Sequence, residues 1–192
     1  RVYGEGETTI ACISGAKQTM SAWKSFVSFF KKSYRVVLFD MPGQGRSQIV
    51  SGSARVTLDE QLEIMHQVFA ATKVFEAKNR MLIGGSWGSI LAAAYSGRNP
   101  QVFQKVILAS FGTKPNSVLK SIIGDVRDLI EAGRGKEIAP MMVKRFGQQV
   151  PGSLKRQIAA QFESMSEQQY QSFYEHCEFV LEIGDFNNCL DL

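Results

Sequence analysis

The sequence predicts an α/β fold in which a parallel, doubly wound sheet is followed by a lid of helices. Over residues 1–113, short segments rich in apolar and β-branched residues alternate with segments of helical periodicity. Strands that alternate with helices form a parallel sheet covered on both faces. No strand pattern occurs over residues 114–184. We therefore expect a core at 1–113, a helical lid at 114–184 and the start of a return to the core at 185–192.

Four strands and three intervening helices are predicted in the core. The strands are Thr8–Ser14, Tyr34–Asp40, the apolar run that starts at Met81, and Lys105–Ser110. The helices lie at about Met20–Lys32, from Thr57 with Glu60 completing a capping box, and directly after Ser86. The first residues, Arg1–Gly4, are expected to be the tail of a strand that began upstream. Helices of the lid are expected at about 118–130, 138–146, 154–162 and 167–181.

The third predicted strand runs into the pattern G-x-S-x-G, which is Gly84-Gly85-Ser86-Trp87-Gly88. This pattern is typical of a nucleophile elbow, in which a serine sits on a strained strand-to-helix turn. Ser86 is therefore the candidate nucleophile, and the backbone N–H of Trp87 is a candidate donor to an oxyanion. A glycine-serine loop that occurs by chance is the alternative. The apolar run before the motif and the alanine-rich helix after it favour the elbow.

A second oxyanion donor is expected at the end of the first strand, where the sequence is Ile13-Ser14-Gly15-Ala16. The backbone N–H of Ala16 is the candidate, and an ordinary strand-to-helix turn is the alternative. Asp40 ends the second strand and is interpreted as an organiser of the glycine-rich turn at 41–47. That turn lacks the lysine and the spacing of a phosphate-binding loop, and no cofactor is predicted.

A serine nucleophile needs a histidine base and an orienting acid, which in this fold follow the serine in the chain. His66 precedes Ser86 and lies within a predicted helix, and His176 lies within the last one. No acidic residue after Ser86 follows a predicted strand. We therefore expect the acid, the base and the last strands of the sheet to lie outside these 192 residues.

Composition and charge limit the kinds of fold, binding partner and cysteine site that the chain can have. With 44% hydrophobic residues in 192, the chain has enough apolar residues for one sizeable core. The net charge is +4, and residues 114–156 carry nine basic and four acidic residues. That excess predicts either docking of an acidic partner or a solvated helical face, whereas nucleic acid is disfavoured. The cysteines have no metal spacing and are expected to be buried free thiols in a reducing cytoplasm; they are Cys12, Cys177 and Cys189.

Taken together, these landmarks resemble the α/β-hydrolase superfamily. Within it, the chain is similar to bacterial acyltransferases that use β-hydroxyacyl chains on acyl carrier protein, namely hydroxyalkanoyloxy-alkanoate synthase of rhamnolipid biosynthesis and hydroxyacyl carrier-protein:coenzyme A transacylase. The landmarks are Gly15-Ala16 with Thr19, Val36–Asp40 with Pro42, Gly45 and Ser47, Ser86-Trp87-Gly88, Arg98-Asn99-Pro100, and His176 before Phe179-Val180-Leu181. The resemblance implies an acylated Ser86, with Ala16 and Trp87 as the oxyanion donors.

Three functions follow as hypotheses. The first is an acyltransferase or thioesterase of lipid metabolism that acts on acyl thioesters linked to acyl carrier protein or coenzyme A. The second is a carboxylester hydrolase, and the third is a catalytically inactive, truncated binding module. An open sheet edge would also favour self-association. Apolar residues of the lid would line an acyl-chain groove or form ordinary core; they are Val118, Ile122, Phe146 and Phe162.

Overall fold

The computed structural model describes residues 1–47, 56–146, 149 and 151–183. The chain divides into two compact units, of which the first contains Arg1–Lys114 and the second is Pro115–Glu182. The predicted return to the core at 185–192 lies outside the described residues, as does Cys189.

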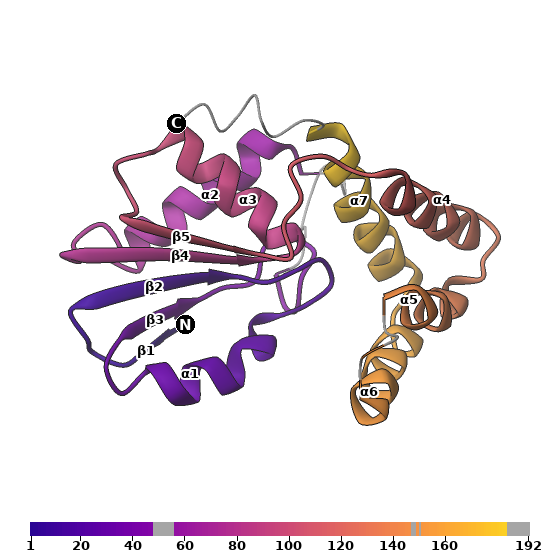
Figure 1. The fold of residues 1–192 in the computed structure, drawn as a ribbon, viewed down its shortest axis with the longest axis horizontal. Coiled ribbons are helices and arrows are strands. Elements are labelled where there is room, and N and C mark those ends of the chain that lie inside the picture. Colours follow the sequence, from indigo (N-terminus) through magenta and orange to yellow (C-terminus); the bar gives the residue numbers. More distant parts are fainter. Residues whose placement is uncertain (48–55, 147–148, 150, 184–192) are drawn as a thin grey trace. The chain divides into compact units, whose positions relative to one another are not determined.

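The first unit is built on a five-stranded sheet with the order β1-β3-β2-β4-β5 (Figure 1). The strands are β1 (Val2–Tyr3), β2 (Thr8–Ile13), β3 (Arg35–Leu38), β4 (Asn79–Gly85) and β5 (Lys105–Ala109). The four predicted strands are therefore present, and β2 pairs in parallel with both β3 and β4. Strand β4 pairs in parallel with β5 in turn.

The expectation of a wholly parallel sheet is wrong at one edge, where β1 pairs antiparallel with β3. Consecutive parallel strands need a long crossover connection, whereas only residues 4–7 separate β1 from β2. Strand β1 must therefore run opposite to β2 and to its parallel neighbour β3. The chain reverses at Gly4, which has a positive φ of 73°.

Helices cover both faces of the sheet (Figure 1). One face carries η1 (Met20–Trp23) and α1 (Lys24–Phe30), so the predicted helix from Met20 begins as a 3₁₀ turn. Aromatic side chains of this segment, Phe26 among them, pack against a buried cluster that includes Ile10, Val36 and Cys12. Burial raises the pKa of the Cys12 thiol to about 12, because the charged thiolate is poorly solvated there.

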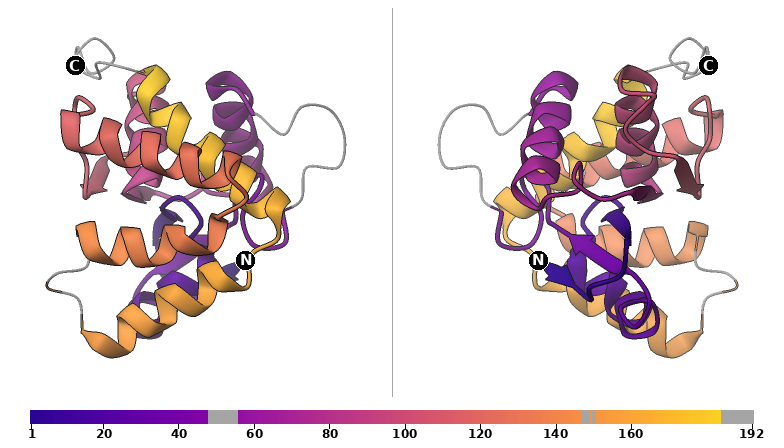
Figure 2. Two further views of the ribbon diagram at one scale, coloured as in Figure 1. Left: turned by 90° about the vertical axis from the view of Figure 1, so that its right-hand side faces the viewer. Right: turned by 90° about the vertical axis from the view of Figure 1, so that its left-hand side faces the viewer.

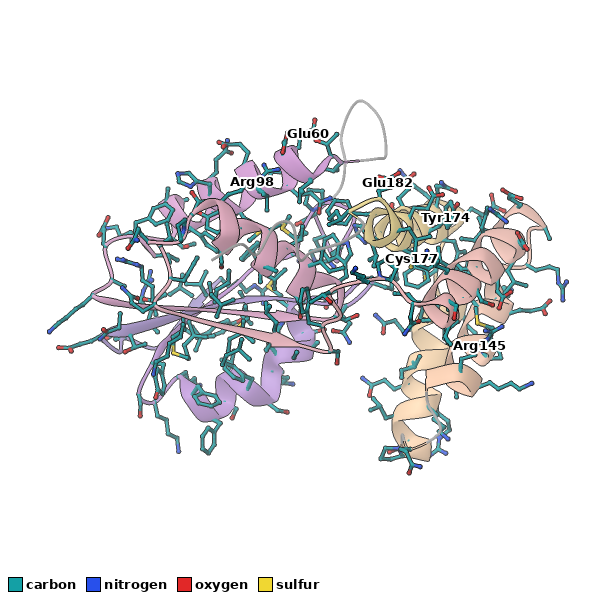
Figure 3. All side chains as sticks on the ribbon, turned by 45° about the horizontal axis from the view of Figure 1, so that its top comes forward. Glu60, Arg98, Arg145, Tyr174, Cys177 and Glu182 are labelled. Carbon is teal, nitrogen blue, oxygen red and sulfur yellow. The ribbon has the colours of Figure 1, made fainter. Side chains whose placement is uncertain are left out.

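The other face carries α2 (Leu58–Ala71) and α3 (Trp87–Arg98). The predicted capping box of α2 is confirmed: Thr57 Oγ1 accepts from the N–H of Glu60, and Glu60 Oε2 accepts from the N–H of Thr57. Figure 3 labels Arg98 near the end of α3, where its guanidinium donates to Asp59 beside Glu60 at 2.6 Å. Every residue from Trp87 to Tyr95 is buried, so α3 is the central helix of this unit.

The second unit is helical, as predicted. Its described part contains η2 (Gly135–Glu137), α4 (Ser117–Glu131), α5 (Ile138–Phe146), α6 (Gly152–Glu163) and α7 (Glu167–Ile183), which Figure 2 shows from two sides. Phe162 stacks edge-on against Phe173 with ring centroids 5.2 Å apart, and the Tyr170 hydroxyl donates to the Phe162 carbonyl at 2.6 Å. None of the helices in the described residues combines the length and hydropathy needed to cross a bilayer.

Two of the four residues proposed to line an acyl-chain groove are buried. Ile122 is 2% exposed and Phe162 is 7% exposed, so ordinary core is the correct interpretation for both. Val118 is 59% exposed. The side chain of Phe146 lies outside the described part of the structure.

Candidate active site

The turn between β4 and α3 lies at the edge where the parallel strands end (Figure 1). Ser86 occupies this turn. Its backbone has φ 52° and ψ −119°, which a residue with a Cβ atom adopts only at a cost of about 1–3 kcal/mol. Such a conformation projects the serine side chain away from both the strand and the helix. The strained turn predicted from G-x-S-x-G is therefore present in the backbone.

The end of β5 anchors this turn. The carbonyl oxygen of Ala109 accepts from the Ser86 N–H at 2.8 Å. The buried Ser89 hydroxyl lies 2.7 Å from the same oxygen and 2.7 Å from the carbonyl oxygen of Gly84. The Ser89 side chain, in the first helical turn of α3, thus links the end of β4 to the end of β5.

We expect Ser89→Ala to lower the free energy of unfolding by about 1–2 kcal/mol, because the carbonyl oxygens of Gly84 and Ala109 lose a shared hydroxyl donor. Ser96→Ala is the matched control, since the Ser96 hydroxyl on the same helix is buried and has no hydrogen-bond partner in the described residues. Urea denaturation of both variants measures the effect. Equal stability of the two variants would contradict the role assigned to Ser89.

The two outer glycines of the motif are required by close backbone contacts. A Cβ atom on Gly84 would lie 2.3 Å from the carbonyl oxygen of Gly88, and one on Gly88 would lie 2.5 Å from that of Ser14. The middle glycine differs, because a Cβ on Gly85 would meet no atom within 4 Å. The end of β2 therefore packs directly on the first turn of α3.

The loop after β2 places Gly15 and Ala16 beside the serine. A Cβ atom on Gly15 would lie 3.3 Å from Ser86 Cβ, so only a residue without a side chain approaches this closely with ease. The Ala16 N–H donates no hydrogen bond within the described residues. Trp87 is the first residue of α3, and the first N–H groups of a helix have no acceptor in their own helix. The structure thus brings the three predicted site residues to one edge of the sheet.

Residues around this loop fix its shape. Gln18 donates its N–H to the Gly15 carbonyl at 3.1 Å and accepts the Gly15 N–H on Oε1 at 3.2 Å. Lys17 adopts a positive φ of 63°, and its partial burial lowers the pKa of its ammonium. The Trp23 indole donates to the Ser14 hydroxyl at 3.0 Å. Together these contacts define a tight turn rather than an open loop.

The glycine-rich turn at 41–47 packs against the loop after β2. Asp40 Oδ1 accepts the N–H of Met20 at 2.6 Å, and the Asp40 carbonyl accepts from the Ser47 hydroxyl at 2.9 Å. Gly45 has φ 52°, and a Cβ atom there would lie 2.3 Å from Asp40 Oδ2. Asp40 thus contacts both sides of the turn. The residue that sequence reasoning missed is Gln44, which is 1% exposed and donates a side-chain hydrogen bond to the Gly15 carbonyl. Its flanking glycines were the available signal.

No base for Ser86 is identified among the described residues of the first unit. His66 Nδ1 pairs with the Tyr95 hydroxyl at 3.0 Å, and Tyr95 lies nine residues beyond Ser86 on α3. Two and a half helical turns therefore separate the serine from this pair. The described residues also contain no group of three or more His, Cys, Asp or Glu side chains that could hold a metal ion.

A shallow depression of about 390 Å³ opens at the opposite edge of the sheet, where β2 and β3 begin. Arg35 and Lys73 contribute to its lining, together with Glu7 and Glu76. The length of β4, roughly 20 Å for seven residues, separates this edge from Ser86. The depression is therefore not part of the candidate active site.

Comparison with known proteins agrees with this architecture. The chain is 23% identical over 188 residues to the (R)-3-hydroxydecanoyl-ACP:CoA transacylase of Pseudomonas putida, covering 95% of this chain and 62% of that protein. It is 26% identical over 116 residues to strigolactone esterase D14 of Arabidopsis thaliana, covering 59% and 42% respectively. It thus spans about three fifths of the transacylase and less than half of the esterase.

The fold has close counterparts among solved structures. MGS-M2, an alpha/beta hydrolase enzyme from a Medee basin deep-sea metagenome library, superimposes with a TM-score of 0.79 at 17% identity, over 99% of this chain and 70% of that one. Residues 9–132, which run from β2 through the end of α4, match the family described as the alpha/beta hydrolase fold. Elbow, sheet order and family match agree, and the chain belongs to the α/β-hydrolase fold family of hydrolases and acyltransferases.

Proposed function

We propose that this protein is a serine-dependent acyltransferase or thioesterase that acts on hydroxyacyl thioesters through an acyl-enzyme on Ser86. The observation that carries the proposal is the strained backbone of Ser86, held beside the Gly15-Ala16 turn at the carboxyl edge of the sheet. Strain of this kind persists where the surrounding structure enforces it, and it is concentrated at functional sites.

In the proposed first step, the Ser86 hydroxyl oxygen bonds to the carbonyl carbon of the thioester and its proton passes to a general base. The carbonyl oxygen gains a negative charge, which the N–H groups of Ala16 and Trp87 would stabilise. The carbon–sulfur bond then breaks, the thiol leaves with a proton, and the acyl group remains as an ester on Ser86. A hydroxyl, a thiol or water takes the acyl group in the second step.

A thioester on acyl carrier protein or coenzyme A is the substrate class that we favour. The Pseudomonas putida relative is named as a transacylase between these two carriers. The charge of the second unit supports an acidic carrier, because α5 and α6 carry Lys144, Arg145, Lys155 and Arg156 but only one acidic residue, Glu163. Arg145 pairs with Asp125 of α4, whereas the other three side chains form no ion pair within the described residues. Opposite charge would increase the rate of encounter with an acidic protein.

A carboxylester hydrolase is the second candidate. The geometry at Ser86 would serve an oxygen ester equally well, and the Arabidopsis thaliana relative is named as an esterase. The two candidates differ in the leaving group, which is a thiol in one case and an alcohol in the other. Substrates with matched acyl chains therefore separate them.

The test is incubation of the protein with a 3-hydroxyacyl thioester of coenzyme A, the same acyl group on carrier protein, and a short aryl ester. We expect an acyl adduct on the peptide that contains Ser86, formed faster from the thioesters than from the aryl ester. Intact-protein and peptide mass spectrometry measure both the adduct and its position.

Each other outcome selects against the proposal in a different way. A faster reaction with the aryl ester would favour the carboxylester hydrolase. The absence of an adduct with any substrate, and with a fluorophosphonate, would favour an inactive binding module. An adduct on a residue other than Ser86 would remove the basis of the proposed mechanism.

Size-exclusion chromatography of the same sample measures the proposed self-association.

A further inference from the structure

We infer that Gln44 is a positioning residue that orients the N–H of Ala16 towards the developing oxyanion. The inference rests on the proposed function, since it assigns Gln44 a part in the acyl transfer at Ser86. The hydrogen bonds of the Gln44 side chain are made to Met41 and Gly15 and not to Ser86, so Gln44 acts through the peptide group that joins Gly15 to Ala16.

The side-chain amide of Gln44 is held at both ends. Its Nε2 donates to the Gly15 carbonyl oxygen at 2.9 Å, and its Oε1 accepts the N–H of Met41 at 3.2 Å. The backbone of Gln44 is fixed as well, because its N–H donates to Met41 and its carbonyl accepts from the Ser47 N–H. An almost fully buried amide with both functions satisfied has one orientation only.

The consequence for Ala16 follows from the geometry of the peptide group. The Gly15 carbonyl and the Ala16 N–H belong to one planar unit, and in a trans peptide they point in opposite directions. A donor that fixes the direction of the Gly15 carbonyl therefore also fixes the opposite direction of the Ala16 N–H. The same hydrogen bond also polarises the peptide group, which strengthens its N–H as a donor.

Gln44 is the contact that ties this peptide to a distant part of the chain. The Gly15 carbonyl also accepts the N–H of Gln18, but that donor lies three residues away within the same turn and would move together with it. Gln44 lies 29 residues along the chain, on the turn that follows β3. That turn is anchored by Asp40 and by the Gly43–Ser47 backbone bond of 2.8 Å. The orientation of the Ala16 N–H is thus set by a turn anchored at the end of β3, and not only by contacts within its own loop.

Gln44→Met tests the inference, because methionine keeps the length of the side chain and removes both the donor and the acceptor. Gln61→Met is the matched control: Gln61 is 3% exposed and donates Nε2 to the Val56 carbonyl at 2.9 Å, on α2. A loss of stability common to both variants would report only the removal of a buried hydrogen bond.

The first measurement does not depend on activity. One-bond residual dipolar couplings report the direction of each backbone N–H vector. We expect the coupling of Ala16 to change in Gln44→Met while those of β2 stay at their wild-type values, and all to stay unchanged in Gln61→Met. An unchanged Ala16 coupling in Gln44→Met would overturn the inference, whatever the result for the acyl adduct.

The second measurement is the rate of Ser86 acylation as a function of substrate concentration. We expect the saturating rate of Gln44→Met to fall by about tenfold to a hundredfold, less than the roughly 10²–10³-fold loss on removal of an oxyanion donor. The half-saturating concentration should change little, because the N–H acts in the transition state. A saturating rate equal to that of Gln61→Met would also overturn the inference, whereas absence of wild-type acylation would count against the proposed function alone.

Gln44→Glu provides a second variant should Gln44→Met fail to fold. A protonated carboxyl can donate to the Gly15 carbonyl and an ionised one cannot. The acylation rate of Gln44→Glu relative to wild type should therefore rise as the pH is lowered from about 8 to about 5. A ratio that does not depend on pH would contradict the donor role.

Discussion

Replacement of Ser86 by alanine or by glycine is expected to abolish the acyl adduct, with different effects on stability. Both variants lack the hydroxyl that forms the covalent bond. Alanine keeps a Cβ atom at φ 52° and ψ −119° and therefore keeps the backbone strain. Glycine adopts positive φ without that cost, so Ser86→Gly should be more stable than Ser86→Ala by about 1 kcal/mol, after the greater chain entropy of glycine is counted.

This pair of variants separates chemistry from strain. At an ordinary helical position glycine is less stable than alanine by roughly 1 kcal/mol, so the expected order is the reverse of the usual one. Fluorophosphonate labelling followed by intact-protein mass spectrometry measures the adduct, and urea denaturation measures the free energy of unfolding. Persistent labelling of Ser86→Ala would show that another residue is the nucleophile. Ser86→Ala being the more stable variant would refute the strain at the turn.

Gly88→Ala is expected to destabilise the protein strongly. Among the three glycines of the motif, only Gly84 would bring an added Cβ atom closer to a backbone atom. The new Cβ atom would lie 2.5 Å from the Ser14 carbonyl oxygen and 2.6 Å from that of Ile13. Neither oxygen can move freely, because β2 is paired on both sides, with β3 and β4. Overpacking of this kind costs about 3 kcal/mol, which corresponds to a fall in Tm of roughly 10 °C for a domain of this size.

The displaced end of β2 also carries Gly15 and Ala16, so the adduct on Ser86 should form more slowly in Gly88→Ala. Gly85→Ala is the matched control within the same motif, since its Cβ would meet no atom within 4 Å. We expect that variant to keep its Tm within a few degrees. Differential scanning calorimetry of the two variants compares them directly. A Tm for Gly88→Ala close to that of Gly85→Ala would show that β2 does not pack on α3 as described.

Much of the first unit follows from local sequence signals. Thr57 and Glu60 predicted a capping box because both partners lie within four residues, and the structure contains it. The alternation of apolar strands with periodic helices predicted the parallel ladder of β2, β3, β4 and β5. Strand residues were expected at Arg1–Gly4, where β1 lies, but its antiparallel pairing with β3 was missed, although the short connection at residues 4–7 excludes a parallel crossover from β1 to β2.

The proposed acyl-chain groove is a feature that local sequence signals could not decide. Val118 and Ile122 both occur in the apolar pattern of one predicted helix, but the structure exposes the first and buries the second. Periodicity shows that a helix has an apolar face, whereas burial of a given residue depends on which elements pack against it. The sequence could not distinguish a groove from a core for that reason.

By itself, the sequence determined the strained strand-to-helix turn at Ser86, since the strand, the turn and the helix that create it are contiguous in the chain. It also indicated Ala16 and Trp87 as candidate oxyanion donors, because Ala16 follows the Gly15 turn at the end of a predicted strand and Trp87 follows Ser86. Only the tertiary structure showed that Ala109 anchors the elbow and that Gln44 holds the Gly15 carbonyl. These contacts join residues 20 or more positions apart, and they exist because parallel strands bring their carboxyl ends to one edge of the sheet. No local pattern records which loops meet there.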